Sequence, residues 1–208
     1  KGISLSSGHS HILLSNGTIL TWGSNAGSFG APVLPGGVLY TGMAAGRSFS
    51  LFLRDNGTII GAGDNTYNQI SPIPTLPGGV TYTQVSAGGY FAAALRSDGN
   101  IVMWGAVSGF TAIPALPGGT TYTAVACGWG HCAAIRSDNV VVMWGTPAVA
   151  PYTALYTIPA FGGLTPVSVA AGIWHTLLRM NNGTVLSWGR SDISELHTVA
   201  ALPGGMTY

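Results

Sequence analysis

The sequence is short of charge. Asp, Glu, Lys and Arg together make up 6% of its 208 residues, and seven basic against six acidic residues leave a formal net charge of +1. A chain with so weak a field has little to attract it to the phosphate backbone of a nucleic acid or to an anionic membrane surface. We therefore expect no nucleic-acid partner.

Long apolar runs are also missing. The stretch from Gly99 to Ile135 holds no charged residue, but prolines, paired glycines and threonines interrupt it. A membrane-spanning helix needs about 20 consecutive apolar residues, so the sequence predicts no membrane span. Uncharged Thr, Ser, Asn and Gly dominate the polar residues, and this composition favours an extracellular or secreted location.

What the sequence has in abundance is internal repetition. Five similar segments each begin at a glycine and contain an apolar run, a two-residue turn and a second apolar run, which ends in Trp-Gly in four of them. Repeats of about 40 residues are typical of proteins built by stacking copies of one structural unit. The leading glycines are spaced by 38, 42, 40 and 44 residues and are Gly8, Gly46, Gly88, Gly128 and Gly172.

The repeats read as β-structure throughout. Asn-Gly or Asp-Gly pairs separate the two apolar runs in four copies, and such pairs favour tight hairpin turns. A fourth extended piece, residues 111–116 in the third copy, precedes a Pro-Gly-Gly break. The sequence therefore predicts an all-β chain, a single β-propeller domain over residues 1–208 with about five four-stranded antiparallel blades. Five copies favour a closed ring, and a fragment of a larger ring is the alternative.

The repeat unit resembles the regulator of chromosome condensation (RCC1-like) repeat family of β-propellers. The resemblance rests on the Gly-x-x-His step, the Asn-Gly turn, the strand ending in Trp-Gly and a Gly-x-Asn-x-x-Gly-Gln-like loop, which is recognisable at residues 63–69 and in part at 23–27. It covers essentially the whole chain. The short repeat is closer to that of bacterial members, which include a type II β-lactamase inhibitory protein. The resemblance implies a rigid, non-enzymatic binding disc.

Two sets of loops are expected to emerge on one face of the blades, and they carry the candidate binding residues. The loops differ from copy to copy and are rich in aromatic residues, which are enriched with arginine at binding hot spots. The alternative is that these aromatics close the end of the core. In a bacterial inhibitor of the family, aromatics at the corresponding loop face the partner. The first set offers His9, Arg47, Tyr90, Trp129 and Trp174; the second offers Tyr67 and Phe110, with Phe29, Asn68, Tyr152, Asp192 and Glu195 beside them.

Three functions fit such a face. A protein–protein interaction module is favoured, because a single composite surface suits loops that differ in every copy. A secreted lectin is the runner-up, since aromatic rings stack on sugars, although a lectin of this kind is expected to repeat its site. A structural repeat module of a larger extracellular protein needs no site. With no nucleophile motif, phosphate loop or paired acids, we expect no enzyme activity and no cofactor.

The histidines of the repeat step offer a metal site as a further interpretation. His11, His131 and His175 each follow a leading glycine by three residues, and three histidines can bind zinc. Phe49 and Phe91 stand at the same step in the other copies. A position that alternates His with Phe favours packing, so no metal site is predicted.

Two kinds of covalent modification stay open. The only cysteines, Cys127 and Cys132, flank a four-residue loop and either form a disulfide, which requires an oxidising compartment, or remain two buried thiols. Asn-Gly-Thr triplets formally accept N-glycosylation, but a tight hairpin selects the same residues. These triplets begin at Asn16, Asn56 and Asn182.

Overall fold

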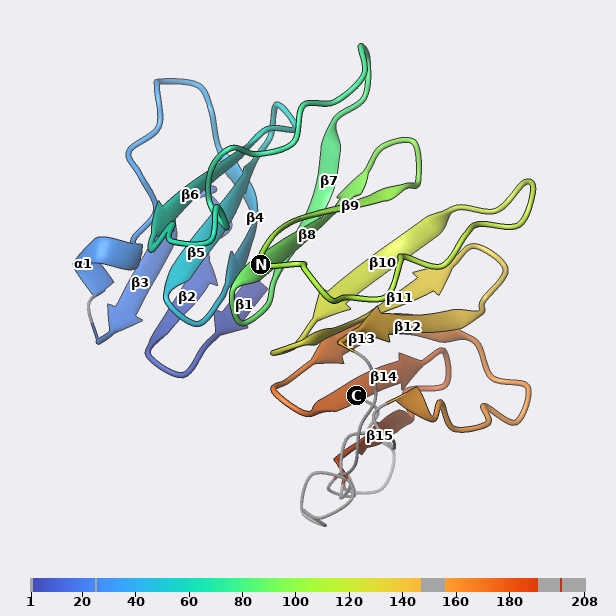
Figure 1. Ribbon diagram of the computed structural model, residues 1–208. Coiled ribbons are helices and arrows are strands. Elements are labelled where there is room, and N and C mark those ends of the chain that lie inside the picture. Colours follow the sequence, from blue (N-terminus) through green and yellow to red (C-terminus); the bar gives the residue numbers. More distant parts are fainter. Residues whose placement is uncertain (1, 25, 147–155, 191–198, 200–208) are drawn as a thin grey trace. The chain divides into compact units, whose positions relative to one another are not determined.

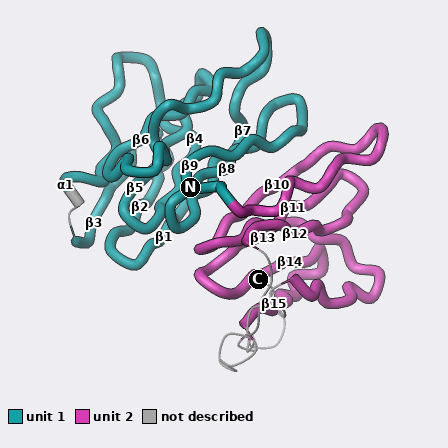
Figure 2. The backbone as a smooth tube through the Cα atoms, viewed as in Figure 1, with its two compact units in different colours: residues 1–108 teal, residues 109–208 magenta. Residues whose placement is uncertain are grey.

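The chain folds into small antiparallel β-sheets. The computed structural model describes residues 2–24, 26–146, 156–190 and 199 (Figure 1). The chain divides into two compact units, Lys1–Ser108 and Gly109–Tyr208, which are described one at a time (Figure 2). The described residues form five sheets of three strands each. The all-β prediction is confirmed, while closure of the sheets into a ring stays a prediction.

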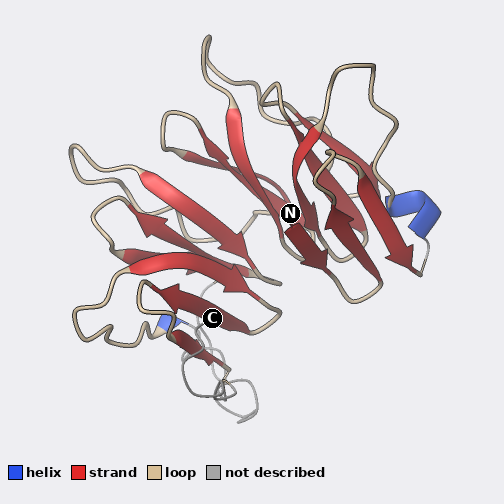
Figure 3. Ribbon diagram, turned by 180° about the vertical axis from the view of Figure 1, so that it is seen from behind, coloured by secondary structure: helices blue, strands red, loops and turns tan. Residues whose placement is uncertain are grey.

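The first unit contains three of the sheets. In each, three consecutive strands pair antiparallel in chain order, so every connection within a sheet is a hairpin. One short helix, α1 (Ala26–Phe29), lies beside the third strand of the first sheet (Figure 3). The strands are β1 (Gly2–Leu5), β2 (His9–Leu13) and β3 (Ile19–Gly23); β4 (Tyr40–Ala45), β5 (Phe49–Arg54) and β6 (Ile59–Gly63); β7 (Tyr82–Ala87), β8 (Phe91–Arg96) and β9 (Ile101–Gly105).

The second unit repeats this arrangement in two sheets. Its strands are β10 (Tyr122–Cys127), β11 (His131–Arg136) and β12 (Val141–Gly145); β13 (Pro166–Ala171), β14 (His175–Met180) and β15 (Val185–Gly189). The hairpins between second and third strands turn at the pairs that the sequence marks. Gly99 and Gly183 have φ of 77° and 80°, and Asn139 takes the same left-handed conformation at 66°. In the part of the chain that is described, no helix is long and apolar enough to cross a membrane.

The predicted fourth strand of each blade is not confirmed. Within the described residues, segment 111–116 joins no ladder, although the Thr111 amide donates to the Gly145 carbonyl at 2.8 Å. The segments before the sheets are rich in proline, which lacks the N–H that a ladder strand must donate. Instead, a tyrosine at the start of the first strand holds the segments before β4, β7 and β10. The hydroxyls of Tyr40 and Tyr82 donate to the carbonyls of Pro32 and Pro74, both at 2.6 Å.

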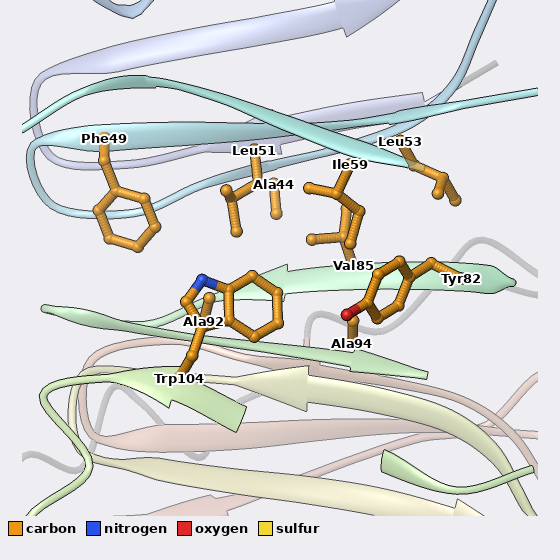
Figure 4. Packing of buried hydrophobic residues seen from close by; sticks show 10 residues of the cluster. All are labelled: Ala44, Phe49, Leu51, Leu53, Ile59, Tyr82, Val85, Ala92, Ala94 and Trp104. Atoms are coloured by element: carbon orange, nitrogen blue, oxygen red, sulfur yellow. The ribbon is translucent and has the colours of Figure 1, made fainter. Parts of the chain in front are cut away.

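The core lies between successive sheets. We call the side of each sheet that bears the third-strand tryptophan position its tryptophan face, and the other side its reverse face. Figure 4 shows the reverse face of β4–β6, with Phe49 and Leu51, packed against the tryptophan face of β7–β9, with Trp104. Phe49 and Leu51 are fully buried, which stabilises the fold by about 1.5–3 kcal/mol for each side chain. The tryptophan positions are Trp22, Ala62, Trp104, Trp144 and Trp188.

The same rule holds at the two other junctions within the units. Leu13 on the reverse face of β1–β3 packs with Phe52 of the next sheet. In the second unit, Ile135 and Val141 on the reverse face of β10–β12 pack with Trp188 on the tryptophan face of β13–β15. Each described junction therefore joins the reverse face of one sheet to the tryptophan face of the next.

Candidate functional site

In each sheet, the loop between the first two strands and the loop that follows the third strand lie at the same end, as the sequence predicts. The residue after the third strand donates its amide to a carbonyl in the loop between the first two strands. In the first unit, Asp64 donates to Ser48 at 2.8 Å and Ala106 to Tyr90 at 3.0 Å. The second unit repeats these bonds, from Thr146 to Gly130 at 2.9 Å and from Arg190 to Trp174 at 2.8 Å. We call this end of each sheet its loop end.

Three of the expected binding residues gather at the loop end of the first unit. The Arg47 guanidinium lies over the Tyr90 ring, with Cζ 5.0 Å from the ring centroid. The Tyr67 ring lies on Tyr90 in turn, with centroids 5.1 Å apart and the planes tilted by 57°. Arg47 is exposed, and Tyr67 keeps 49% of its surface accessible. These three side chains, from three different loops, form the loop cluster.

A set of internal hydrogen bonds fixes the loop that presents Tyr67. The Gln69 side chain, which is fully buried, accepts from the Tyr67 amide at 2.8 Å and donates to the Asp64 carboxylate at 3.0 Å. Asp64 also accepts from the hydroxyl and the amide of Thr66, at 2.6 and 3.0 Å. These bonds, the Thr66 hydroxyl first, lower the pKa of Asp64. These bonds therefore fix the backbone at Tyr67 from within the loop itself.

An asparagine closes the base of the same loop. The Asn65 side chain accepts from the amides of Ile70 and Ser71, at 2.9 and 3.1 Å, and donates to the Ser71 carbonyl at 3.0 Å. Asn68 adopts φ of 60°, which few residues other than glycine and asparagine tolerate. The loop motif in the sequence marks these residues, but only the structure shows that Asp64, Asn65 and Gln69 serve to hold Tyr67.

The second unit brings its own loop residues to its loop ends. Trp129 and Trp174 are partly buried, as is Phe110. The sulfur atoms of Cys127 and Cys132 form a disulfide across the base of the Trp129 loop, between residues that pair directly in the β10–β11 ladder. Of the two alternatives that the sequence leaves open, this structure contains the disulfide. The remaining expected loop residues, Tyr152, Asp192 and Glu195, lie outside the described part of the chain.

The placement of His9 in a loop is wrong. His9 is 2% exposed and lies in β2, opposite Gly23, where Phe49 lies opposite Gly63 in the next sheet. The Ser6 amide bonds the His9 carbonyl at 3.0 Å, as the Gly46 amide bonds that of Phe49 at 2.9 Å. The first copy therefore aligns on Ser6, and its loop residues are Ser7 and Gly8.

The physical reason is a ring that covers the leading position of each copy. A Cβ added at Gly46 would come within 2.2 Å of the Phe49 ring, which explains the glycine. In the first copy a serine fits, because the Ser6 hydroxyl lies at hydrogen-bond distance, 3.0 Å, from Nδ1 of His9. Aligning on Gly8 misplaces the copy by two residues. The Asn16-Gly17 turn, 40 residues before Asn56-Gly57, is the signal that restores the register.

In this register, His9 and His11 are buried core residues. His9 and His11 both reach the Ser50 hydroxyl with Nε2, at 2.9 and 2.8 Å, and His11 Nδ1 lies 2.8 Å from the Thr21 hydroxyl. Burial lowers the pKa of His9 and lowers that of His11 to about 4, with a smaller contribution from His9. A neutral pair satisfied by hydroxyls is a packing arrangement.

The second unit shows the same behaviour. His131 Nε2 lies 3.1 Å from the Thr176 hydroxyl, and burial lowers the pKa of His131 to about 4. His11 does not share the position of His131 and His175, so the three do not form one symmetric set. No group of three His, Cys, Asp or Glu side chains suited to a metal ion occurs among the described residues.

The three Asn-Gly-Thr triplets lie at exposed hairpin turns away from the loop ends. In each, the asparagine side chain accepts from the threonine amide, for example at 3.1 Å between Asn56 and Thr58. The same bond measures 3.0 Å at Asn16 and 2.9 Å at Asn182. The asparagines therefore have a structural role in the turn, and their glycosylation stays a prediction.

Comparison with known proteins agrees with this architecture. A sequence model of the family described as "Regulator of chromosome condensation (RCC1) repeat" matches residues 40–69, 82–106, 122–147 and 167–192, which together make up half of the chain. No curated protein matches the sequence.

Several solved structures share the fold. The CRINKLY WD40 ectodomain of the receptor kinase ACR4 from Arabidopsis thaliana matches with a TM-score of 0.63 and 19% identity, over 90% of this chain and 62% of that one. Human WBSCR16 matches with 0.66 and 22%, over 90% and 61%. Prp20p from Saccharomyces cerevisiae, which has binding properties to Gsp1p and histones, matches with 0.64 and 21%, over 88% and 56%. This chain spans about three fifths of these relatives.

Proposed function

We propose that this chain, which belongs to the regulator of chromosome condensation (RCC1) repeat family, is a non-enzymatic module that binds another protein through the loop ends of its sheets. The observation that carries the proposal is the loop cluster of Arg47, Tyr67 and Tyr90. Tyrosine and arginine are enriched at the centres of protein interfaces. A cluster drawn from three loops also suits one composite surface.

Preorganisation of the cluster supports this function. The hydrogen bonds of Gln69 and Asp64 fix the backbone that presents Tyr67. A loop that is already ordered loses little conformational entropy on binding, so more of the contact energy appears as affinity. The disulfide at the base of the Trp129 loop has the same effect in the second unit.

The structural neighbours support a protein partner by analogy. The yeast neighbour Prp20p binds Gsp1p and histones, which are themselves proteins. The low charge of this chain differs from what histone binding would favour, so we transfer the mode of function and not the partner. The disulfide and the likeness to a receptor ectodomain support an extracellular or secreted location.

The test compares loop variants in a binding assay. Extracellular proteins from the source organism are passed over the immobilised chain, and over Tyr67→Ala and Tyr90→Ala variants of equal thermal stability. Val33→Ala, at a side chain that is 98% exposed and outside the cluster, is the matched control. We expect a partner that Val33→Ala retains, with affinity reduced about 30-fold by each tyrosine change. Equal retention by all variants would contradict the proposal.

A glycan array tests the runner-up function, a secreted lectin. The same four proteins are applied to it, together with a Trp129→Ala, Trp174→Ala double variant. Sugar binding that the tryptophan variant loses would identify a lectin. A module with neither protein nor glycan binding would be the structural repeat unit.

A further inference from the structure

Arg47 is the only charged residue in the loops that join the first two strands of the five sheets. It follows Gly46 in the loop before β5, and its side chain is exposed. The residues at the same loop position in the other sheets are uncharged and differ from one another; they are Ser7, Gly89, Trp129 and Ile173. The repeat therefore does not require an arginine at this position.

Three other arginines do have a place in the repeat, because each of them ends the second strand of a sheet. Two of these form ion pairs with the aspartate two residues further on, Arg96 with Asp98 and Arg136 with Asp138. The third is Arg54. Recurrence at one position beside a hairpin turn indicates a structural role. Arg47 lies at the opposite end of its strand and is not part of this pattern.

The position of the Arg47 guanidinium is suited to recognition. Its Cζ lies over the Tyr90 ring, 5.0 Å from the centroid, and this cation–π contact orients the group. Contact with a ring uses a face of the guanidinium, whereas its N–H donors point outward in the plane of the group. The loop end of the first unit thus presents an oriented fork of hydrogen-bond donors beside the half-exposed Tyr67 ring.

The acidic residues of the first unit are placed differently. Asp55 and Asp98 lie in hairpin turns between second and third strands, at the end opposite to the loops. Asp64 lies at the loop end, but its carboxylate accepts hydrogen bonds from Thr66 and Gln69 within its own loop. The loop cluster therefore combines one cation with two phenol groups and contains no acidic residue of its own.

A carboxylate is the group that this arrangement fits. Its two oxygens match the planar fork of a guanidinium, and the rings beside the fork accept the apolar part of the same segment. We propose that the protein partner places an aspartate or glutamate side chain against Arg47 and an apolar or aromatic residue against the Tyr67 ring. The inference rests on the proposed function and specifies the chemistry of the partner at that site.

The charge of the loop end favours a carboxylate over a phosphate group. A phosphorylated side chain carries about two negative charges at neutral pH and is typically bound by a cluster of arginines. Here a single arginine is available, and the amide of Asp64 bonds the carbonyl of Ser48, the residue next to Arg47. Hydrogen bonds, from Thr66 first, lower the pKa of Asp64, so its own negative charge persists at neutral pH. One further negative charge is balanced at this site, and two are not.

The first step of the test finds a ligand for the cluster without the natural partner. A phage library of random peptides is selected on the immobilised chain, and clones that also bind a Tyr90→Ala variant are discarded. Tyr67→Ala, at the exposed ring, serves instead if Tyr90→Ala lowers the melting temperature. We expect the remaining peptides to carry Asp or Glu beside an apolar or aromatic residue. Peptides without this enrichment, or no cluster-dependent peptide, would overturn the inference, while the proposed function keeps its separate test with extracellular proteins.

The second step measures whether the acid contacts Arg47. The best peptide is synthesised with its acid, with the matching amide and with phosphoserine in its place, and its dissociation constants for the original chain and for Arg47→Gln are measured by fluorescence polarisation. We expect the amide to weaken binding about tenfold or more in the original chain and to change little in Arg47→Gln. Equal losses in both proteins would place the acid elsewhere. A phosphoserine peptide that binds the original chain more tightly than the acidic one would identify a phosphate ligand. Either result overturns the inference.

Arg179→Gln is the matched control. Arg179 is exposed on β14, outside the loop cluster, and its replacement removes the same charge from the chain. We expect the acidic peptide to bind this variant as tightly as it binds the original chain. Arg47→Lys keeps the charge without the planar fork, so we expect it to recover only part of the affinity. A loss in Arg179→Gln equal to that in Arg47→Gln would assign the effect to net charge and overturn the inference.

Discussion

The indole Nε1 of Trp104 donates a hydrogen bond of 2.8 Å to the backbone carbonyl of Gln69. The bond ties the loop after β6 to the last strand of the following sheet. The side chain of the same glutamine holds Tyr67 and Asp64. Packing between sheets and presentation of the loop cluster therefore depend on one residue.

Replacing Gln69 by alanine should disorder the loop without touching the Tyr67 ring. The change removes the acceptor of the Tyr67 amide and one donor to Asp64, which keeps its bonds from Thr66. Loss of a typical hydrogen bond costs about 0.5–1.5 kcal/mol. We expect a fall of this size in the free energy of unfolding, and faster hydrogen exchange confined to residues 64–71. Tyr67→Phe is the control, because it keeps every backbone bond. Unchanged exchange in Gln69→Ala would show that Asn65 alone holds the loop.

Stability should depend on pH through the buried histidines. The pKa values of His11 and His131 are lowered to about 4, whereas the unfolded chain titrates near 6.5. Between pH 6.5 and 4 these histidines are protonated in the unfolded state and neutral in the folded state. The free energy of unfolding is therefore greatest above pH 6.5 and falls as the pH approaches 4. Urea unfolding at pH 7.5, 6, 5 and 4 measures the loss.

A substitution taken from the repeat isolates one of these histidines. Phe49 and Phe91 occupy the position of His131 in other sheets, so His131→Phe should keep most of the stability at pH 7.5. The variant should lose less stability than the original chain between pH 6.5 and 4, by up to about 3 kcal/mol. Parallel pH curves for the two proteins would exclude His131 as a source of the dependence.

The disulfide should contribute a modest, measurable stability. Cys127→Ala with Cys132→Ala reproduces Ala87 and Ala92, which pair at the same place in the third sheet. Because the closed loop is short, the loss should be about 2 kcal/mol. The original chain in reductant should show the same denaturation midpoint as the double variant. A reductant that changes neither the mass of the alkylated protein nor its midpoint would contradict the bridge.

Two tryptophans at equivalent positions should respond differently to truncation. Trp104 is 6% exposed and packs between sheets, so Trp104→Ala should cost about 3–5 kcal/mol. Trp22 is 49% exposed, and Trp22→Ala should cost under about 1 kcal/mol. Thermal or denaturant unfolding of the two variants gives the comparison. A large loss from Trp22→Ala would mean that its face is already covered.

The sequence predicts the strands and hairpins well because their signals are local. Short apolar runs and tight turns, which are Asn-Gly or Asp-Gly in four sheets and Asp138-Asn139 in β10–β12, fix the second and third strands. The predicted fourth strand is not confirmed, and the reason is equally local, since prolines such as Pro72, Pro74 and Pro114 cannot donate to a ladder. The prediction of His9 as a loop residue is wrong because the repeats were aligned on glycine. In the first copy Ser6 holds that position, and its hydroxyl lies at hydrogen-bond distance from the His9 ring.

The sequence likewise predicts the residues of the candidate site but not the contacts between them. Loop position and residue type single out Arg47, Tyr67 and Tyr90, but their clustering depends on contacts between residues 23 and 43 positions apart. Likewise, the sequence around Asp64 does not show that its carboxylate accepts hydrogen bonds from Thr66 and Gln69.

By itself the sequence determined that this protein is all-β and repetitive, because turn chemistry and strand periodicity act over a few residues, and its repeat motif matches the RCC1 repeat family. The tertiary structure decided which faces meet, which loops cluster and which tryptophan is covered. Those outcomes depend on side chains brought together from separate sheets. Trp22 and Trp104 belong to the same Trp-Gly motif, yet Trp22 is 49% exposed, whereas Trp104 packs against Phe49 and Leu51 of β4–β6 and is 6% exposed.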